Sequence, residues 1–347
     1  MSKGRNNLSV VGGEKRMIEN KKSSILLILK ILEEYSDEDH FLTQQDIIDK
    51  VHDIYGIDLE RKSVAFSISL LQELDYDINK SPRGGYALLS RMLDTSEIRF
   101  ITDALFSSKS IGGKQAVKLS KRLNGCLSRY QRKDYNYIYK STEINRYENK
   151  ELFYILETIE TAKNIGKRVS FQYISFDSSG RPYVKRGGYR YIVSPYFTVN
   201  SNGRYYLICN YRDKYRPIQS FRIDYIVNVQ IENEWDIKPL ETLEGMKDFN
   251  ITKYLNENIY MLSGDSIMAS IDIENESVIP AIIDWFGDNA RIYRYSEKGN
   301  IHATIVCNEN ALFYWCMQYS ENIKVTSPQS LINRIKTEAE RMIKKYA

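Results

Sequence analysis

The hydrophobic period of the chain changes at Val169, and this change constrains the fold more than any other feature of the sequence. Before it, apolar residues recur at three- and four-residue steps, as in SILLILKILEEY at 24–35, which is the spacing of an amphipathic helix. After it, RVSFQYISF at 168–176 alternates, with Val169, Phe171 and Tyr173 on one face. Because a period of two buries one face of a strand, the sequence predicts a mainly helical first half followed by a β-rich segment.

Three short helices and a hairpin are predicted near the N-terminus. The second helix begins after Thr43, which is a suitable N-cap residue. The third helix carries Val64, Ile68 and Leu71 on one face, at steps of four and three residues. A Pro-Arg-Gly-Gly turn at 82–85 then separates two short extended pieces, the pattern of a hairpin.

This order of elements is typical of a winged helix-turn-helix, whose third helix enters the major groove of DNA. Cations stand where that geometry needs them, at the start of the third helix and on the hairpin. The DNA-binding residues predicted from this pattern are Arg61, Lys62, Ser63, Ser67, Lys80 and Arg83. The alternative is a small helical domain that docks on protein, which is favoured by the slight acidity of residues 1–93, with 13 Lys and Arg against 15 Asp and Glu.

Further helices are predicted on both sides of the β-rich segment. Residues 95–130 have a helical pattern that the glycine pair at 112–113 breaks in two, and residues 148–166 form another helix. Residues 240–347 alternate predicted strands and helices, and Ser327 is expected to cap the last helix.

The β-rich segment is also the basic part of the chain. Residues 161–235 hold 12 Lys and Arg against 5 Asp and Glu, although the net charge of all 347 residues is only +4. About five strands fit between residues 168 and 232, and we expect a compact, strongly bent antiparallel sheet. Such a sheet suits an anionic partner, but a solvated basic face without a ligand has the same composition.

The stretch GRYYLICNYRDKYRPIQSFRIDYI at 203–226 brings tyrosines and arginines together. A nucleotide needs cations for its phosphates and flat rings for its base. Arg222 stands between apolar neighbours, so it requires an anion that a ligand could supply. Core packing is the alternative for the rings and is the simpler interpretation of Tyr205, Leu207 and Phe221. The predicted ligand-binding residues are Arg190, Ser194, Tyr205, Tyr206, Arg212 and Arg222.

These modules, in this order, resemble the WYL-domain transcriptional regulators of bacteria that carry a C-terminal extension called WCX. The resemblance covers about residues 22–345 and rests on PYFTVNSNGRYYLICNYRDK, SFRIDYI and ALFYWCMQYSENIKVTSP. The Trp-Tyr-Leu of the family is Tyr-Tyr-Leu at 205–207 here. Its Phe-Arg-Leu-Asp-Arg-Ile is Phe-Arg-Ile-Asp-Tyr-Ile at 221–226, so Tyr225 replaces the second arginine.

The resemblance implies an α+β multidomain fold, with a small Sm-like antiparallel β-barrel as the WYL domain. It also implies a ligand-responsive DNA-binding regulator: the winged helix binds a double-stranded operator, the WYL domain senses a nucleotide or single-stranded nucleic acid, and WCX assists dimerisation. Similar proteins often accompany stress, phage-defence or CRISPR loci. The expected parts are a disordered leader at 1–21, a winged helix-turn-helix at 22–92, a helical linker at 93–166, the WYL domain at 167–236 and WCX at 237–347.

A homodimer is expected because one winged helix covers only a short half-site. The apolar residues Leu312, Phe313 and Trp315 offer contact area for it, unless they pack inside their own domain, in which case the linker helices are the alternative dimer surface.

A second class of function stays open, in which the chain is an accessory protein that binds RNA or single strands alongside a phage-defence or CRISPR system. A palindromic operator favours the regulator. Single-strand binding that survives loss of residues 1–92 favours the accessory protein.

An enzyme is not expected. The three histidines, His40, His52 and His302, are scattered, and HExxH, GxSxG and GxxxxGK[ST] motifs are absent from the sequence. We therefore predict no catalytic residue, no metal site and no cofactor. The four cysteines form no CxxC pair, no apolar run reaches the length of a membrane span, and the N-terminus lacks the apolar core of a signal peptide. A cytoplasmic protein with reduced thiols is expected.

Overall fold

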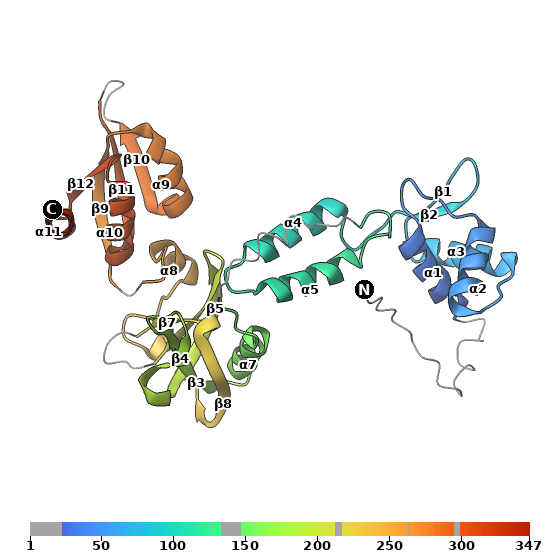
Figure 1. Cartoon of the computed structure of the whole chain (residues 1–347), viewed down its shortest axis with the longest axis horizontal. Helices are drawn as coiled ribbons and strands as arrows, with labels where there is room; N and C mark the ends of the chain where they lie inside the picture. The colour runs from blue at the N-terminus through green and yellow to red at the C-terminus, as the bar shows by residue number, and fades with distance from the viewer. Residues whose placement is uncertain (1–22, 133–146, 212–216, 263, 295–298) are drawn as a thin grey trace. The chain divides into compact units, whose positions relative to one another are not determined.

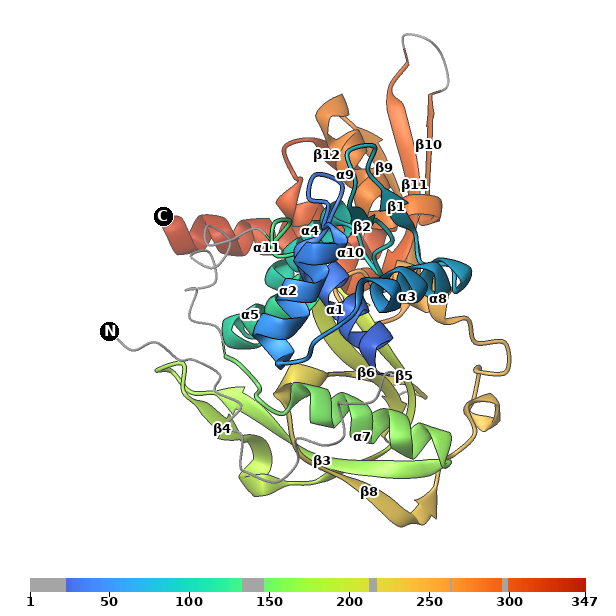
Figure 2. The same ribbon diagram turned by 90° about the vertical axis from the view of Figure 1, so that its right-hand side faces the viewer.

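The computed structural model describes residues 23–132, 147–211, 217–262, 264–294 and 299–347. The chain forms two compact units, one of residues 1–107 with 111–146 and one of residues 108–110 with 147–347. Figures 1 and 2 show the elements of each unit in two views. The leader predicted at 1–21 lies outside the described residues, and so does Arg212.

The first unit begins with three helices and a two-stranded antiparallel sheet, which we call the N-terminal module. Its elements are α1 (Ser24–Tyr35), α2 (Gln44–Tyr55), α3 (Arg61–Glu73), β1 (Ile78–Lys80) and β2 (Tyr86–Leu88). The apolar faces of the helices meet in one core, as their periodicity predicts, with Ile28, Leu32, Ile47, Val51 and Val64 among its fully buried members. The predicted helices and hairpin are therefore present in the predicted order.

Thr43 caps α2, as its position before the helix predicts. Its hydroxyl accepts a hydrogen bond from the Asp46 N–H at 3.1 Å, and the Asp46 carboxylate accepts one from the Thr43 N–H at 2.8 Å. This reciprocal capping box satisfies backbone donors that have no partner inside the helix. The hydrogen bonds from Thr43 also lower the pKa of Asp46.

Two helices, α4 (Thr95–Ser107) and α5 (Gly113–Asn124), follow the module and pack against each other. Gly112 is the N-cap residue of α5, so the break predicted at the glycine pair is confirmed. The contact between the helices is narrow, because the buried side chains on the two helices are only Ile98, Thr102, Ala116 and Ser120.

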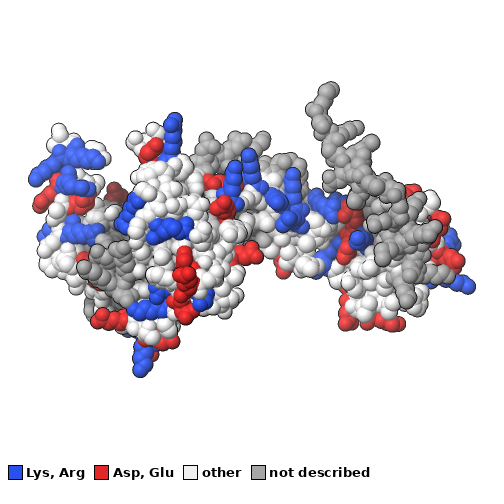
Figure 3. All heavy atoms as spheres, turned by 90° about the horizontal axis from the view of Figure 1, so that it is seen from below, with Lys and Arg blue, Asp and Glu red and all other residues white. Residues whose placement is uncertain are grey.

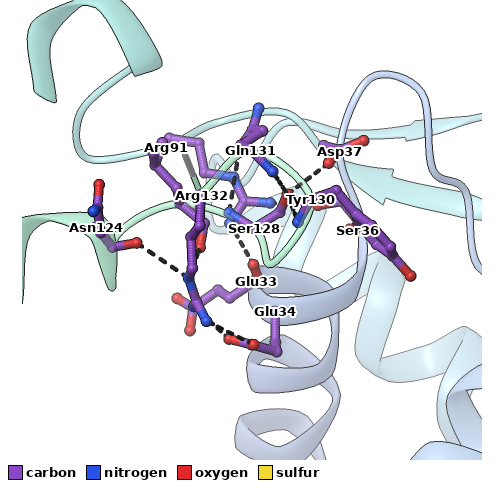
Figure 4. Close-up of polar contacts among 11 residues, drawn as sticks. Glu33, Glu34, Ser36, Asp37, Arg91, Asn124, Ser128, Tyr130, Gln131 and Arg132 are labelled. Carbon is purple, nitrogen blue, oxygen red and sulfur yellow. Dashed lines mark hydrogen bonds and ion pairs between the residues drawn. The ribbon is translucent and has the colours of Figure 1, made fainter. Parts of the chain in front are cut away.

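Residues 125–132, the segment after α5, return to the N-terminal module at a junction shown in Figure 4. The Ser128 hydroxyl donates a hydrogen bond to the Asp37 carboxylate at 2.6 Å. Arg132 forms a bidentate ion pair with the Glu34 carboxylate, with N–O distances of 2.8 and 2.5 Å. The junction therefore fastens the segment to the C-terminal end of α1.

Asp37 is the buried carboxylate at the centre of this junction. It lies 2.6 Å from His40 Nδ1, and the His40 ring stacks on Tyr130 with the centroids 3.8 Å apart. Burial by itself raises the pKa of Asp37, but the hydrogen bonds from Ser128 and His40 outweigh burial and the pKa is lowered. Asp37 is therefore an anion in the folded protein at neutral pH.

The second unit contains a curled sheet that follows one helix. The helix is α7 (Leu152–Asn164), and Gly166 lies just beyond it in the left-handed conformation, with φ 68°. The strands are β3 (Lys167–Phe176), β4 (Pro182–Val184), β5 (Tyr191–Ser201), β6 (Arg204–Asn210), β7 (Gln219–Arg222) and β8 (Ile226–Asp236). The short 3-10 helices η1 (Lys185–Gly188) and η2 (Ile223–Tyr225) interrupt them.

This sheet is antiparallel and runs in the order β7-β6-β5-β3-β8, with β4 beside the end of β3. Register shifts at Ser170–Gln172 and Pro195–Phe197 interrupt the ladders of β3 and β5, and such bulges bend a sheet. Among the described strands, β7 and β8 do not pair with each other. The short helix η2 separates them along the chain. The described strands therefore form a curled half-barrel, in agreement with the strongly bent antiparallel sheet that the sequence predicts.

The C-terminal part of this unit has a four-stranded antiparallel sheet in the order β10-β11-β9-β12. Its strands are β9 (Ser266–Ile273), β10 (Ala290–Arg294), β11 (Ile301–Asn308) and β12 (Ile323–Ser327). The helices are α8 (Ile251–Glu257), α9 (Ile279–Phe286), α10 (Glu309–Gln318) and α11 (Gln329–Tyr346), with η3 (Leu240–Thr242), η4 (Glu276–Val278) and η5 (Gly287–Asn289).

One expectation for this region is wrong. Ser327 ends β12 and does not cap α11, whose N-cap residue is Pro328, because the strand continues through the predicted cap. Leu312, Phe313 and Trp315 are buried in the core of their own domain, so the alternative in which they pack there is confirmed.

The four cysteines are free thiols, and burial raises the pKa of Cys307 and Cys316 to about 12. Within the described part of the chain, the helices are too short or too polar to cross a membrane.

Candidate functional site

The start of α3 holds three of the six predicted DNA-binding residues. Arg61 and Lys62 are exposed and Ser63 is half-buried. The Arg61 guanidinium donates to the side-chain oxygen of Gln45, on α2, at 3.1 Å. Glu60 is the N-cap residue of α3, and its side chain makes no capping hydrogen bond to the first N–H groups of the helix.

Ser67 does not share this surface. It is 3% exposed and lies on the face of α3 that packs into the core with Val64 and Ile68. Phe66 instead lies on the exposed side, four residues after Lys62, and 71% of it is accessible. The sequence does contain a signal for Phe66. It is apolar, it stands four residues after Lys62 and so on the same side of the helix, and it does not lie on the buried face of Val64 and Ile68.

The hairpin places Lys80 and Arg83 in solvent, as predicted. Gly84 and Gly85 have φ values of 87° and 101°, a conformation that favours glycine. A Cβ on Gly85 would also lie 3.2 Å from the Leu42 carbonyl oxygen, so this turn depends on glycine for space as well. Lys80 is the last residue of β1, and Arg83 lies in the turn between β1 and β2.

Arg222 ends β7, and its guanidinium is paired within its own chain. Nε and Nη2 donate to the two carboxylate oxygens of Asp224 at 3.1 and 2.5 Å. Asp224 is only 3% exposed, and its backbone carbonyl accepts a hydrogen bond from Asn149 at 3.2 Å. The anion that a half-buried arginine needs is therefore Asp224, and not necessarily a ligand.

Three more residues surround this ion pair. The guanidinium carbon of Arg222 lies 3.8 Å from the centroid of the Tyr225 ring, a cation–π contact. Arg204 Nη1 lies 3.9 Å from an Asp224 carboxylate oxygen. Tyr206 stands across the ladder from Arg222. We call Arg204, Tyr206, Arg222, Asp224 and Tyr225 the arginine cluster.

The charges of the arginine cluster leave it positive, with two guanidinium groups against one carboxylate. Burial by itself lowers the pKa of Arg222, but the hydrogen bond and charge of Asp224 outweigh burial and the pKa is raised. Burial raises the pKa of the Tyr206 hydroxyl, while the charges of Arg222 and Arg204 oppose that rise. The cluster thus offers two guanidinium groups beside two aromatic rings, which suits an anionic ligand that carries a flat base.

Phe221 and Leu207 belong to the core of the half-barrel, together with rings from β3 and β5. The Phe221 centroid lies 5.3 Å from those of Phe171 and Tyr191 and 5.4 Å from that of Tyr173. The Tyr173 hydroxyl also accepts a hydrogen bond from the Arg222 N–H at 3.1 Å. Leu207 is fully buried. The core-packing alternative is therefore confirmed for Phe221 and Leu207.

Arg190 is not part of the arginine cluster. It donates to the Ser170 hydroxyl at 2.7 Å and to the Asn228 carbonyl at 3.0 Å. Ser170 alternates on β3 with Phe171 and Tyr173, so Arg190 lies on the opposite face of that strand. Its contacts join β3 to β8.

Ser194 and Tyr205 are also elsewhere. The Ser194 hydroxyl is buried and accepts a hydrogen bond from the Lys238 N–H at 3.0 Å. Tyr205 neighbours Tyr206 on β6, so its side chain has the opposite orientation, and its N–H donates to the Ser110 hydroxyl at 3.0 Å. Of the six predicted ligand residues, only Tyr206 and Arg222 lie together among those that the structure describes.

Arg204 and Asp224 are the cluster members that the sequence pattern missed. Arg204 stands two residues before Tyr206 on the same strand, so the alternation of β6 already places both on one face. No such signal identifies Asp224. It lies in η2, outside the strands, and the backbone turn of this short helix brings its carboxylate to Arg222.

Comparison with known proteins gives one family match. Residues 154–231 match the WYL domain family. One similar solved structure is the proteasome accessory factor B/C (PafBC) of Arthrobacter aurescens, with 13% identity and a TM-score of 0.29 over 97% of this chain and 50% of that one. Another is a CRISPR Cas-related protein, with 15% identity and a TM-score of 0.37 over 94% of this chain and 84% of that one. The chain thus spans about half the length of the PafBC chain. No curated protein matches it.

Proposed function

This chain is a WYL-domain protein, and we propose that it is a ligand-responsive transcriptional regulator that binds double-stranded DNA. The observation that carries the proposal is the pairing of two surfaces in one chain. The N-terminal module exposes two cations and an aromatic ring on one helix, and the WYL domain holds a positive cluster of arginine and tyrosine.

In this proposal the N-terminal module is a winged helix-turn-helix. The start of α3 enters the major groove, where Arg61 and Lys62 contact phosphates or base edges. Phe66 contacts the methyl group of thymine, the apolar mark that the major groove displays. Lys80 and Arg83 contact the backbone from the hairpin.

In the WYL domain, the proposed ligand is a nucleotide or a short single strand. Its phosphate binds between Arg204 and Arg222, where one carboxylate leaves one positive charge uncompensated. Its base stacks on Tyr206 or Tyr225, a contact worth roughly 1–3 kcal/mol. Arg222 is then shared between Asp224 and the ligand, so binding redistributes the contacts of η2.

The ligand is proposed to regulate DNA binding by favouring one of two arrangements of the chain. A homodimer fits this role, since two copies match the two halves of a palindromic operator. The chain would act in the cytoplasm by binding alone, without catalysis or a cofactor.

One observation favours the accessory-protein alternative: residues 1–93 carry more acidic than basic residues, whereas residues 161–235 are basic. Under that alternative the WYL domain is the main nucleic-acid site and the N-terminal module contacts protein. The two functions differ in which nucleic acid binds and in which residues bind it.

Footprinting on the DNA upstream of the gene tests the proposal. We expect one protected palindrome, and Arg61→Ala with Lys62→Ala should weaken its binding by about 1–3 kcal/mol if either side chain contacts a base. Lys344→Ala with Lys345→Ala, on α11, is the control with the same loss of charge. Unchanged binding by the α3 variant, together with strong single-strand binding, would favour the accessory protein.

A further inference from the structure

Helix α5 carries a row of cations that the proposed function does not use. Lys114, Lys118, Lys121 and Arg122 are all exposed, and α5 contains no acidic residue. The sequence has no Asp or Glu between Asp103 and Asp134. Lys and Arg side chains gather over the α4–α5 hairpin on the face seen in Figure 3. We call the four residues the α5 stripe.

The α5 stripe occupies one side of its helix. At about 100° per residue, the four positions fall within an arc of about 100°, and at about 1.5 Å per residue they span about 12 Å of the axis. The buried side of the helix, with Ala116 and Ser120, packs on α4. The stripe is therefore a straight, narrow row of cations directed away from the hairpin contact.

Repulsion between like charges makes this arrangement unfavourable for an isolated helix. The helix dipole disfavours Lys114 in the first turn and favours Lys121 and Arg122 in the last turn, so the dipole alone does not decide the matter. Lys118 has a like charge four residues before it and others three and four residues after it, and such pairs repel. Neither an ion pair nor an aromatic contact joins any stripe residue to the described part of the chain. A solvated helix face usually mixes both signs, so a single-sign row indicates an anionic partner.

We propose that the α5 stripe binds the phosphate backbone of duplex DNA, as a second contact beside the N-terminal module. This inference rests on the proposed DNA-binding function. One strand of a duplex carries a phosphate about every 3.4 Å of axis, so about 12 Å of helix faces three or four phosphates with four cations. The stripe thus has the charge and the length of one short run of backbone.

Duplex DNA fits the α5 stripe better than a single strand does. Single-strand sites interleave cations with aromatic rings on which bases stack. α5 holds no Phe, Tyr or Trp. Phosphate contacts without stacking position a protein on DNA but do not select a sequence, so the stripe should add affinity to every duplex alike.

The salt dependence of binding to a random-sequence 40-base-pair duplex tests this inference without a known operator. The α5 variant replaces Lys114, Lys118, Lys121 and Arg122 with glutamine, a good helix former. Each lost phosphate contact should reduce the slope of log K against log salt by about 0.9, so a total reduction of about 3–4 is expected. The control replaces four exposed lysines of the second unit with glutamine, namely Lys324, Lys336, Lys344 and Lys345.

The control should keep the wild-type slope. An α5 variant with the wild-type slope would overturn the inference, and so would a control that loses as much. A loss seen only with a 40-nucleotide single strand would also overturn it. Arg61→Ala with Lys62→Ala separates the two proposals: if this variant weakens binding and the α5 variant does not, only the α5 stripe is refuted. If wild type binds no duplex, both fail. Circular dichroism verifies that each variant is folded.

Discussion

Replacing Arg222 by alanine should destabilise the protein as well as any ligand complex. The side chain of Arg222 is 22% exposed and that of Asp224 only 4%. Removing the guanidinium takes away both donors, at 3.1 and 2.5 Å, from a carboxylate that water barely reaches. The carboxylate would then be a buried anion with Arg204, 3.9 Å away, as its nearest cation.

The expected cost follows from that geometry. Removing one partner of a buried ion pair typically costs about 3–5 kcal/mol. Arg204 compensates in part, so we expect about 3 kcal/mol, the low end of that range. Asp224→Asn leaves an arginine that solvent still reaches, and its expected cost is smaller, about 1.5–3 kcal/mol. The single change Arg222→Gln completes a cycle with Asp224→Asn. The double variant, Arg222→Gln with Asp224→Asn, removes both charges and should cost less than the sum of these two single changes.

Urea denaturation, followed by tryptophan fluorescence, measures the stability of the compact unit that contains Arg222. All three tryptophans, Trp235, Trp285 and Trp315, belong to the unit that contains Arg222. The double-mutant cycle should give a coupling energy of about 0.5–3 kcal/mol. Arg341→Ala, which removes an exposed partner of Glu338, is the control and should change stability little.

A coupling energy near zero, or an Arg222→Ala midpoint equal to that of wild type, would refute this reasoning. If the prediction holds, loss of ligand binding by Arg222→Ala does not by itself identify a ligand contact. The neutral pair, Arg222→Gln with Asp224→Asn, is then the variant that tests ligand binding without a buried unpaired charge. Nucleotides and short oligonucleotides are suitable probes, measured by calorimetry.

Three further predictions concern the N-terminal module. Asp37→Asn should cost about 1.5–3 kcal/mol at neutral pH; because the pKa of Asp37 in the fold lies below its usual 3.8, this stabilisation is present above that pH and is lost as the pH falls through the lowered value, which denaturation at several pH values checks. A cost that persists in strong acid would contradict the assignment. Thr43→Ala should lower stability in thermal unfolding by about 1 kcal/mol by removing the cap of α2. Phe66→Ala should abolish the preference for thymine over uracil in the bound duplex, a preference of about 0.8 kcal/mol for one buried methyl group; equal preference in both proteins would exclude the methyl contact.

The helices and strands were largely predictable because their signals are local. A helix shows its buried side every three or four residues, so the stripe of Val64, Ile68 and Leu71 indicates α3 directly. Thr43 caps α2 through atoms only three residues away. Short elements carry weaker signals. β12 has only five residues and no clear hydrophobic period, so the sequence places Ser327 at the start of the following helix instead of at the end of the strand.

The candidate sites were predictable only where exposure follows from the helix period. Arg61 and Lys62 lie off the apolar stripe of α3 and are exposed, but Ser67 lies on the buried side and Phe66 on the open one. In the sheet, composition alone does not distinguish faces. Arg190, just before β5, and Arg222, at the end of β7, are both arginines of the basic segment, yet they lie on different faces and bind different partners.

By itself, the sequence determined the order of modules, the helices of the N-terminal module and the change to strands at Val169, because each depends on spacing along the chain. Only the tertiary structure decided that Asp224 is the anion of Arg222, that Arg204 and Tyr206 stand beside it, and that β7 and β8 do not pair with each other. Those facts depend on how a three-residue turn and two bulges fold the sheet. Two residues of the cluster, Arg204 and Tyr206, come from a neighbouring strand. Separation along the chain does not predict which strands lie side by side in a curled sheet.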